Sequence, residues 1–279
     1  MLRVALPNKG ILSETAILML KEAGYATRRD IKDLHLIDAE NEVEFFYLRP
    51  RDIATYVGEG SLDAGFTGLD LLLDSRSKAV SVEDLKFGES TFRFAGPVGA
   101  FKSLSDIDGK RVATAYPNLV EDFLAQEGIS VKLVKLDGAV ETAVQLGVAD
   151  AVADVVSTGN TLRQAGLEIF GPTILHSTAQ LIAAPGKQEA SETLLRRLRG
   201  VIVAREYVIF DYDCPVELVE EASALTPGIE SPTISPLRDT EWVAVRALVK
   251  SSEINSKMDA LYLLGARAIL VSAIHAARI

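Results

Sequence analysis

The amino-acid sequence predicts an α/β protein of two similar lobes, followed by a smaller C-terminal domain in the order βαββαβ. Three observations predict this fold class. Short apolar runs alternate with amphipathic stretches that end at glycine, as in parallel sheets covered by helices. A strand, loop and helix pattern occurs twice in the first two thirds of the chain. From Tyr207 onward the order of apolar runs changes.

Helices of the two lobes are expected where an amphipathic stretch stops at a glycine, because glycine readily adopts the left-handed conformation that ends a helix. The stretches that fit are 13–23, 52–57, 119–127 and 140–146, before Gly24, Gly58, Gly128 and Gly147. Apolar strands alternate with these helices, so ligand-binding loops are expected at the carboxyl ends of parallel strands.

The two lobes are expected to be copies of one pattern. Residues 3–5 and 111–113 both read Arg-Val-Ala, and both lead through Pro-Asn into a helix. Two later segments, 60–68 and 147–159, each place a strand before Thr-Gly. The first copy is the longer, which indicates an insertion at 26–44. Chance similarity between two βαβ units is the alternative.

Two such lobes around a cleft describe a bilobal, type II periplasmic-binding-protein-like architecture. The first lobe is expected to comprise residues 1–91 with 179–206, and the second lobe residues 92–178. The chain is expected to cross between them at 92–97 and at 179–184.

The C-terminal domain is expected at 207–279. Its strands are predicted at 207–212, 231–235, 242–249 and 266–274, one helix from Pro215 to residue 225, and another capped by Ser252 and ended by Gly265. This order is that of a ferredoxin-like (ACT-like) domain, whose expected role is regulation or assembly.

Composition excludes several functional classes. The 279 residues contain 29 Lys and Arg against 39 Asp and Glu, a formal charge of −10, which disfavours nucleic acid as a partner. A phosphorylated substrate must then be held by local cations, backbone N–H groups or a divalent metal. Cys214 is the only cysteine, which excludes internal disulfides and cysteine-rich zinc sites. No signal peptide or membrane-spanning run is present, so a cytoplasmic protein without a membrane partner is expected.

The segment 149–162 is the strongest candidate for binding a phosphate. A buried strand leads to Asp154 and then to a loop of small residues that opens a helix. This loop suits a monophosphate, because it offers hydroxyl and amide donors, a helix N-terminus and a glycine that permits close approach. Asp154 can accept hydrogen bonds from ribose hydroxyls. The alternative is an ordinary strand-to-helix turn with capping side chains. The loop residues are Ser157, Thr158, Gly159, Asn160 and Thr161.

Other charged residues are expected at the same cleft. Glu141 is a second acid that, with Asp154, would hold sugar hydroxyls or, through them, a magnesium ion; alone it is an ordinary first-turn glutamate. Lys9 and Arg49 follow apolar strands of the first lobe and are candidates for phosphate charge. Solvation is the alternative for both, and for Arg51 it is the preferred interpretation.

Two further residues are candidates for holding a nucleobase. Asp70 can accept from an amino group, or act only as a first-turn carboxylate. Tyr116 can stack on a purine, or be a half-buried loop tyrosine. The histidines, His35, His176 and His275, lie far apart and support neither a zinc site nor a Ser-His-Asp hydrolase.

Across essentially its whole length the chain resembles the ATP phosphoribosyltransferase family in its long form, which carries a C-terminal regulatory domain. The segments that carry the resemblance are 4–10, 45–50, 65–70, 149–162 and 230–234. The resemblance implies transfer of phosphoribose from 5-phosphoribosyl 1-diphosphate to N1 of ATP, with release of diphosphate, as the first step of histidine biosynthesis. It also implies a need for Mg²⁺, which would be held mainly through substrate oxygens.

The resemblance assigns residues to three ligands. Lys9, Arg49, Glu141 and Asp154 would position the reacting groups and stabilise charge, since attack by a neutral ring nitrogen needs little proton transfer. 5-Phosphoribosyl 1-diphosphate would be bound by Glu141, Asp154, Ser157, Thr158, Gly159, Asn160 and Thr161. ATP would be bound by Arg49, Asp70, Leu71 and Tyr116. Histidine, as feedback inhibitor, would be bound by Asp213, Ser231, Thr233, Leu248 and Ala268.

The family also assembles as homo-oligomers from dimers to hexamers. One local alternative is that Asp213 only caps the helix opened by Pro215. Two alternatives concern the whole chain: a cytoplasmic small-molecule-binding protein with the same bilobal fold, and a nucleobase phosphoribosyltransferase of the more usual single-lobed fold.

Overall fold

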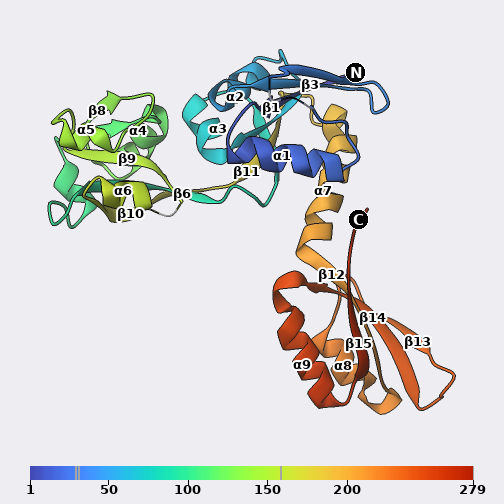
Figure 1. Ribbon diagram of the computed structural model, residues 1–279. Coiled ribbons are helices and arrows are strands. Elements are labelled where there is room, and N and C mark those ends of the chain that lie inside the picture. Colours follow the sequence, from blue (N-terminus) through green and yellow to red (C-terminus); the bar gives the residue numbers. More distant parts are fainter. Residues whose placement is uncertain (29, 31, 158, 279) are drawn as a thin grey trace. The chain divides into compact units, whose positions relative to one another are not determined.

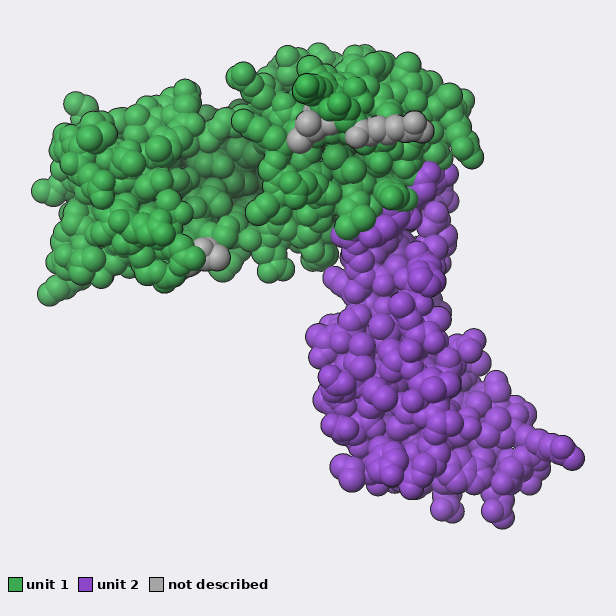
Figure 2. Space-filling model, in the orientation of Figure 1, with its two compact units in different colours: residues 1–21, 25–195 green, residues 22–24, 196–279 purple. Residues whose placement is uncertain are grey.

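The computed structural model describes residues 1–28, 30, 32–157 and 159–278. The chain divides into two compact units (Figure 2). Residues 1–21 and 25–195 form the first, and residues 22–24 and 196–279 form the second. The first unit holds two sheets and the second holds one.

The first sheet of the first unit is six-stranded, in the order β2-β3-β1-β4-β11-β5. Figure 1 labels β1, β3 and β11 of this sheet. Strands β3, β1 and β4 are parallel, and β2 and β11 run antiparallel to them. Strand β5 pairs antiparallel with β11 and so runs in the same direction as β4. The strands are β1 (Leu2–Pro7), β2 (His35–Asp38), β3 (Val43–Leu48), β4 (Ala64–Gly68), β5 (Val80–Asp84) and β11 (Ala179–Ala183). The helices are α1 (Ile11–Glu22), α2 (Pro50–Gly58) and α3 (Leu69–Ser75).

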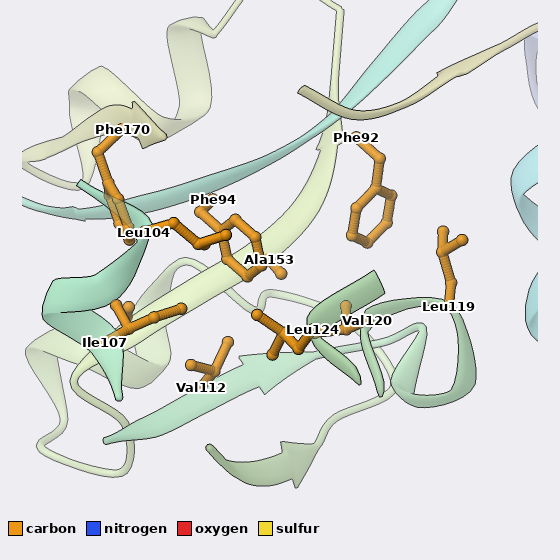
Figure 3. Close-up of a cluster of buried hydrophobic side chains, with 11 residues drawn as sticks. Phe92, Phe94, Leu104, Ile107, Val112, Leu119, Val120, Leu124, Ala153 and Phe170 are labelled. Carbon is orange, nitrogen blue, oxygen red and sulfur yellow. The ribbon is translucent and has the colours of Figure 1, made fainter. Parts of the chain in front are cut away.

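The second sheet is five-stranded, in the order β10-β6-β9-β7-β8. One hydrophobic core of this sheet contains Phe92 and Phe94 of β6 together with Val112, Leu124 and Phe170 (Figure 3). The elements are β6 (Ser90–Pro97), a short 3₁₀ helix (Leu104–Ile107), β7 (Arg111–Thr114), α4 (Pro117–Gln126), β8 (Lys132–Lys135), α5 (Thr142–Gln145), β9 (Ala151–Val156), α6 (Asn160–Gln164) and β10 (Leu167–Ser177).

The internal repeat is visible in the strand order. Parallel strands β3-β1-β4 in one sheet correspond to β8-β7-β9 in the other, and an antiparallel strand lies beside the third member of each set. Strand β2 precedes β3 without a counterpart before β8 among the described residues. It lies within the segment 26–44, where the sequence predicted the insertion.

The chain crosses between the two sheets at 85–89 and at Thr178. The predicted crossing segments, 92–97 and 179–184, lie just after these positions and instead form strands β6 and β11. The two crossings pair with each other: the N–H of Leu85 donates to the carbonyl of Ala179 at 2.9 Å, and the N–H of Ala179 donates to the carbonyl of Phe87 at 2.8 Å.

The second unit has the βαββαβ order that the sequence predicts, and its antiparallel sheet runs β13-β14-β12-β15. Helices α8 and α9 share a core with the buried residues of β12 and β14. Helix α7 (Glu192–Glu206) precedes this sheet along the chain. The other elements are β12 (Tyr207–Pro215), α8 (Val219–Leu225), β13 (Thr233–Pro236), β14 (Trp242–Lys250), α9 (Ile254–Leu264) and β15 (Arg267–Ala273).

Two predictions at the start of this unit are wrong. Strand β12 continues to Pro215 because Asp213 and Cys214 pair with β14, and the alternating burial persists along the whole strand. A 3₁₀ turn follows, so helix α8 begins at Val219 and not at Pro215. Asp213 therefore lies inside a strand and caps no helix.

Within the part of the chain that the structure describes, no helix combines the length and the apolar character required to cross a membrane.

Candidate active site

A cavity of about 650 Å³ lies between the two lobes of the first unit. It lies where parallel strands of both sheets end, which is where α/β folds place their ligand-binding loops. Residues of both lobes line it: Lys9, Gly10, Ile11, Leu12, Pro50, Gly68, Asp70, Leu71, Gly88, Glu89, Ser90, Tyr116, Val155, Ser157 and Ser177. Of the predicted site residues, the structure thus brings Lys9, Asp70, Leu71, Tyr116 and Ser157 to one cavity.

Asp70 is a buried carboxylate at this cavity, with 7% of its surface exposed. The hydroxyl of Ser177 donates to its Oδ1 at 2.9 Å, and the N–H of Asp70 donates to the same hydroxyl at 3.1 Å. A Cβ at Gly68 would overlap Asp70 Oδ1, so any other residue there would displace the carboxylate. Asp70 therefore has a fixed side chain, unlike an ordinary solvated first-turn aspartate.

Tyr116 faces Asp70 from the second lobe. Its ring lies 5.0 Å from the ring of Phe92 in edge contact, and its side chain hydrogen-bonds Asp70. Burial is the main cause that raises the pKa of Tyr116 above its usual value, and the negative charge of Asp70 adds to the shift. The phenol is consequently neutral and able to donate a hydrogen bond.

Arg51 contacts Tyr116, which the sequence analysis did not anticipate. Its guanidinium carbon lies 4.5 Å from the centre of the Tyr116 ring, a cation–π distance. Its Nη1 donates to the carbonyl of Ala115 at 2.8 Å. The sequence favours a solvated Arg51, and 42% of its side chain is indeed exposed, but from the first turn of α2 it also reaches the second lobe.

Asp74 of helix α3 is another residue that sequence reasoning missed. Its Oδ1 accepts the N–H of Asn118 at 2.9 Å and that of Leu119 at 3.1 Å. These N–H groups belong to the first turn of α4, where helical N–H groups have no partner within the helix. Tyr116, at the N-cap of α4, makes no capping bond with its own side chain. A carboxylate of the first lobe thus caps a helix of the second.

Asp154 and Glu141 form an acidic pair in the second lobe. Burial is the main cause that raises the pKa of Asp154, and the charge of Glu141 raises it further. The N–H of Val155, which donates to Asp154 Oδ1 at 2.8 Å, acts in the opposite direction. Arg51 and Asp70 also influence this carboxyl, so the charged groups of both lobes converge here.

The predicted phosphate loop follows Asp154. Ser157, Asn160 and Thr161 are exposed, and Gly159 has a φ of 71°, in the region that favours glycine. Helix α6 has only five residues, so its dipole is weak and anion binding would depend on loop N–H groups and hydroxyls. Thr158 lies outside the described residues.

Two exposed cations border the cavity on the first lobe. Lys9 lines it, and Arg49 is the N-cap residue of α2, next to the lining residue Pro50. Arg49 is not a lining residue itself. Asn8, which the sequence analysis did not single out, has a buried Oδ1 without a hydrogen-bond partner among the described residues.

The five residues expected to bind histidine lie on the strands of the second unit or next to them. Asp213 of β12 pairs with Arg267 of β15, the residue before Ala268. Thr233 of β13 pairs with Arg246 of β14, on the side of β14 that faces away from β12. Leu248 lines a separate cavity of about 200 Å³, and Ser231 lies just before β13.

The contacts of His35 and of the acidic side chains bear on whether the site holds a metal ion. His35 of β2 bonds Glu44 of β3 at 2.6 Å, and neither residue lines the cavity. Among the described residues, no group of three or more His, Cys, Asp or Glu side chains is arranged to hold a metal ion. A magnesium ion held by one or two carboxylates together with substrate oxygens does not need such a group.

Comparison with known proteins agrees with this architecture. Residues 49–200 match the family model described as ATP phosphoribosyltransferase, and residues 204–276 match the model of the HisG C-terminal domain. ATP phosphoribosyltransferase of Paenarthrobacter aurescens is 60% identical over 286 aligned positions, covering 100% of both chains.

Solved structures give the same result. The ATP phosphoribosyl transferase (HisG:HisZ) complex from Thermotoga maritima matches with a TM-score of 0.63 and 30% identity, covering 72% of this chain and 98% of that one. Tv2483 bound to L-arginine shares the fold at 10% identity and a TM-score of 0.50, covering 71% of this chain and 83% of that one. With both domain models matched in order along one chain, the protein belongs to the ATP phosphoribosyltransferase family, in the long form that carries the additional C-terminal domain.

Proposed function

We propose that the cleft of the first unit catalyses the reaction of this family, with the phosphoribosyl donor on the second lobe and ATP against the first. The product is N1-(5-phosphoribosyl)-ATP, the first intermediate of histidine biosynthesis, and diphosphate is released. The observation that carries the proposal is that Asp154, beside Glu141, lies within electrostatic reach of both Asp70 and Tyr116. Asp70 and Tyr116 line the cavity, and Asp154 precedes the lining residue Val155.

The donor side consists of the acidic pair and the loop after it. Asp154 and Glu141 would accept hydrogen bonds from the ribose hydroxyls, and burial, which raises the pKa of Asp154, would strengthen such bonds by excluding water. The exposed hydroxyls of Ser157 and Thr161 would donate to the 5-phosphate, together with the N–H groups around Gly159 and the side chains of Asn160 and Thr158.

The acceptor side is formed by Asp70, Leu71 and Tyr116 around the adenine ring. The Asp70 carboxylate would accept from the exocyclic amino group, and the Tyr116 ring would provide a face for stacking. Lys9 and Arg49, exposed at the edge of the cavity, would meet the phosphate charge of the substrates.

Chemistry at this site consists of positioning and charge stabilisation. N1 of adenine is a neutral nucleophile with a free lone pair, so its attack on C1 of the ribose requires no general base. The transition state resembles an oxocarbenium ion, and the carboxylates of Asp154 and Glu141 would stabilise its positive charge. Magnesium, when bound, would neutralise charge on the departing diphosphate; Asp154 and Glu141 are the side chains suited to hold it through the sugar hydroxyls.

Regulation and assembly belong to the second unit in this proposal. Histidine would bind through Asp213, Ser231, Thr233, Leu248 and Ala268, and the protein would be a cytoplasmic homo-oligomer between dimer and hexamer. Deletion of residues 207–279 is then expected to abolish inhibition by histidine. Inhibition that survives the deletion and is purely competitive with ATP would contradict an allosteric site.

The decisive experiment measures diphosphate release from 5-phosphoribosyl 1-diphosphate and Mg²⁺, with and without ATP. Release that requires ATP and falls on addition of histidine supports both ligand assignments. A folded protein that releases no diphosphate with ATP, or with other purine acceptors, would instead be a binding protein of the same bilobal fold.

A further inference from the structure

Ser177 forms a contact across the two lobes that the reaction as described above does not use. It is the last residue of β10 in the second sheet, and 4% of its surface is exposed. Its hydroxyl both donates to Asp70 Oδ1 and accepts the N–H of Asp70, at 2.9 and 3.1 Å. A single hydroxyl thereby holds the backbone and the carboxylate of one residue.

This double contact changes what Asp70 is able to do. Asp70 lies in the first turn of α3, where an aspartate often accepts the free N–H groups of its own helix. Gly68, the N-cap residue, has no side chain to cap the helix. The Ser177 hydroxyl accepts the N–H of Asp70, and the carbonyl of Thr178 accepts that of Leu69 at 3.0 Å, so these two N–H groups are satisfied without the carboxylate.

The carboxylate is then presented to the cavity in one orientation. Ser177 engages Oδ1, and a carboxylate has about four acceptor positions, so Asp70 retains the capacity to accept further hydrogen bonds. Both Asp70 and Ser177 line the cavity of about 650 Å³. The other side-chain partner in reach is the neutral hydroxyl of Tyr116, a bond that a substrate group can replace.

We propose that Ser177 is a specificity-determining positioning residue, which holds the Asp70 carboxylate in the orientation that accepts the 6-amino group of the acceptor purine. The proposal rests on the assignment of Asp70 to the ATP side of the site. Without the Ser177 hydroxyl, Oδ1 of Asp70 loses its donor, the carboxylate is free to leave this orientation, and the site loses its preference for a 6-aminopurine.

The test compares two acceptors, ATP and purine riboside 5′-triphosphate, which keeps the N1 lone pair and lacks only the amino group. The ratio of kcat/KM for the two reports the contribution of the amino group, since their intrinsic difference in reactivity is the same for every variant. Ser177→Ala is expected to lower this ratio about tenfold through a higher KM for ATP, with KM for 5-phosphoribosyl 1-diphosphate unchanged. Ser177→Thr, which keeps the hydroxyl, should restore the ratio.

Three controls separate the possible outcomes. Ser191→Ala removes another buried serine hydroxyl, which donates to the carbonyl of Gln188 at 2.9 Å and does not line the cavity, and it should leave the ratio unchanged. Ser177→Cys keeps the shape with a poor hydrogen-bonding group, so it should lower the ratio even if the alanine variant does not fold. Asp70→Ala removes the acceptor and should lower the ratio at least as far.

Each result has one meaning. If Asp70→Ala lowers the ratio while the alanine and cysteine variants of Ser177 keep the wild-type value, Asp70 is confirmed and the role of Ser177 is overturned. If Asp70→Ala itself keeps the wild-type ratio, the assignment of Asp70 to ATP fails, and the role proposed for Ser177 fails with it.

Discussion

The carboxylate of Asp74 in the first lobe accepts the backbone N–H of Asn118 in the second, at 2.9 Å. The side-chain amide of Asn118 returns a bond to the carbonyl of Asp74 at 2.7 Å. This reciprocal pair joins α3 to α4 beside the cleft, and Arg76 adds ion pairs to Glu121 and Asp122 of the same helix. The relative position of the two lobes is thus held by helix capping in addition to the crossing strands.

Asp74→Ala should therefore loosen this contact. Loss of a capping carboxylate typically costs about 1 kcal/mol, and here it also removes a connection between lobes. The free energy of unfolding of the intact chain is expected to fall by that amount, and KM should rise for both substrates. Asp106→Ala is the matched control, because Asp106 caps N–H groups within the second lobe. An equal rise in KM for both variants would contradict a specific role for Asp74.

Asp154→Asn should remove most of the transition-state stabilisation while the fold is retained. We expect kcat/KM to fall by about a hundredfold or more, because a neutral amide cannot balance a developing positive charge. Steady-state kinetics with circular dichroism as the folding control measures this. Turnover close to that of the unmodified protein would exclude Asp154 from the site.

The same substitution should affect stability with a defined pH dependence. Burial raises the pKa of Asp154 in the folded protein, so folding favours the protonated carboxyl. The stabilisation that this carboxyl contributes is complete at pH values below its pKa in the unfolded chain. It is lost as the pH rises through its pKa in the folded protein. Asp154→Asn should therefore increase the free energy of unfolding at pH 7 relative to the unmodified protein, and show little gain at pH 3. Chemical denaturation at both pH values is the measurement, and a destabilised variant at pH 7 is the contrary outcome.

Thr161→Ala tests the phosphate loop. One of several donors is lost, so KM for 5-phosphoribosyl 1-diphosphate should rise by about tenfold while kcat changes little. Thr142→Ala removes the threonine hydroxyl that donates to the carbonyl of Ala139 at the start of α5, and it should leave this KM unchanged. A similar effect of both substitutions would mean that the loop does not contact the phosphate.

Arg51→Lys tests the stacked guanidinium. Lysine keeps the charge, but it cannot lie flat on the Tyr116 ring while donating to the carbonyl of Ala115. We expect KM for ATP to rise several-fold because the ring loses its support. Arg267→Lys changes a guanidinium that stacks on Tyr262 in the second unit, 4.7 Å from the ring centre, and provides the comparison. Unchanged ATP kinetics in Arg51→Lys would show that the stack has no part in acceptor binding.

Local patterns predicted the fold and the loops, because they depend on residues close together in the sequence. Glycine at helix ends and the repeated Arg-Val-Ala segments were sufficient to predict two lobes. The prediction that a helix begins at Pro215 is wrong for the same reason. Proline is a favoured first helical residue, but pairing with β14 keeps Pro215 in a strand. Strand pairing depends on distant residues that a local pattern does not contain.

The contacts between the lobes could not be predicted in this way. Asp74, Arg51 and Ser177 each find their partners more than 40 positions away, on the other lobe. Nothing in their immediate neighbours distinguishes them from solvated or capping residues. They become recognisable only when the cleft brings α3, the start of α4 and the end of β10 together.

The two crossings, hydrogen-bonded to each other between Leu85, Phe87 and Ala179, have a consequence for how substrate affinity is used. A bilobal protein joined by long, loose connections would have to immobilise them each time the cleft closes, and ordering a backbone residue opposes binding by about 1–2 kcal/mol. Here the connections are short, and two backbone hydrogen bonds to Ala179 already hold Leu85 and Phe87 in place. Little backbone order then has to be gained at the crossings when substrates bind, so the affinity for both substrates remains available for aligning N1 with the sugar carbon.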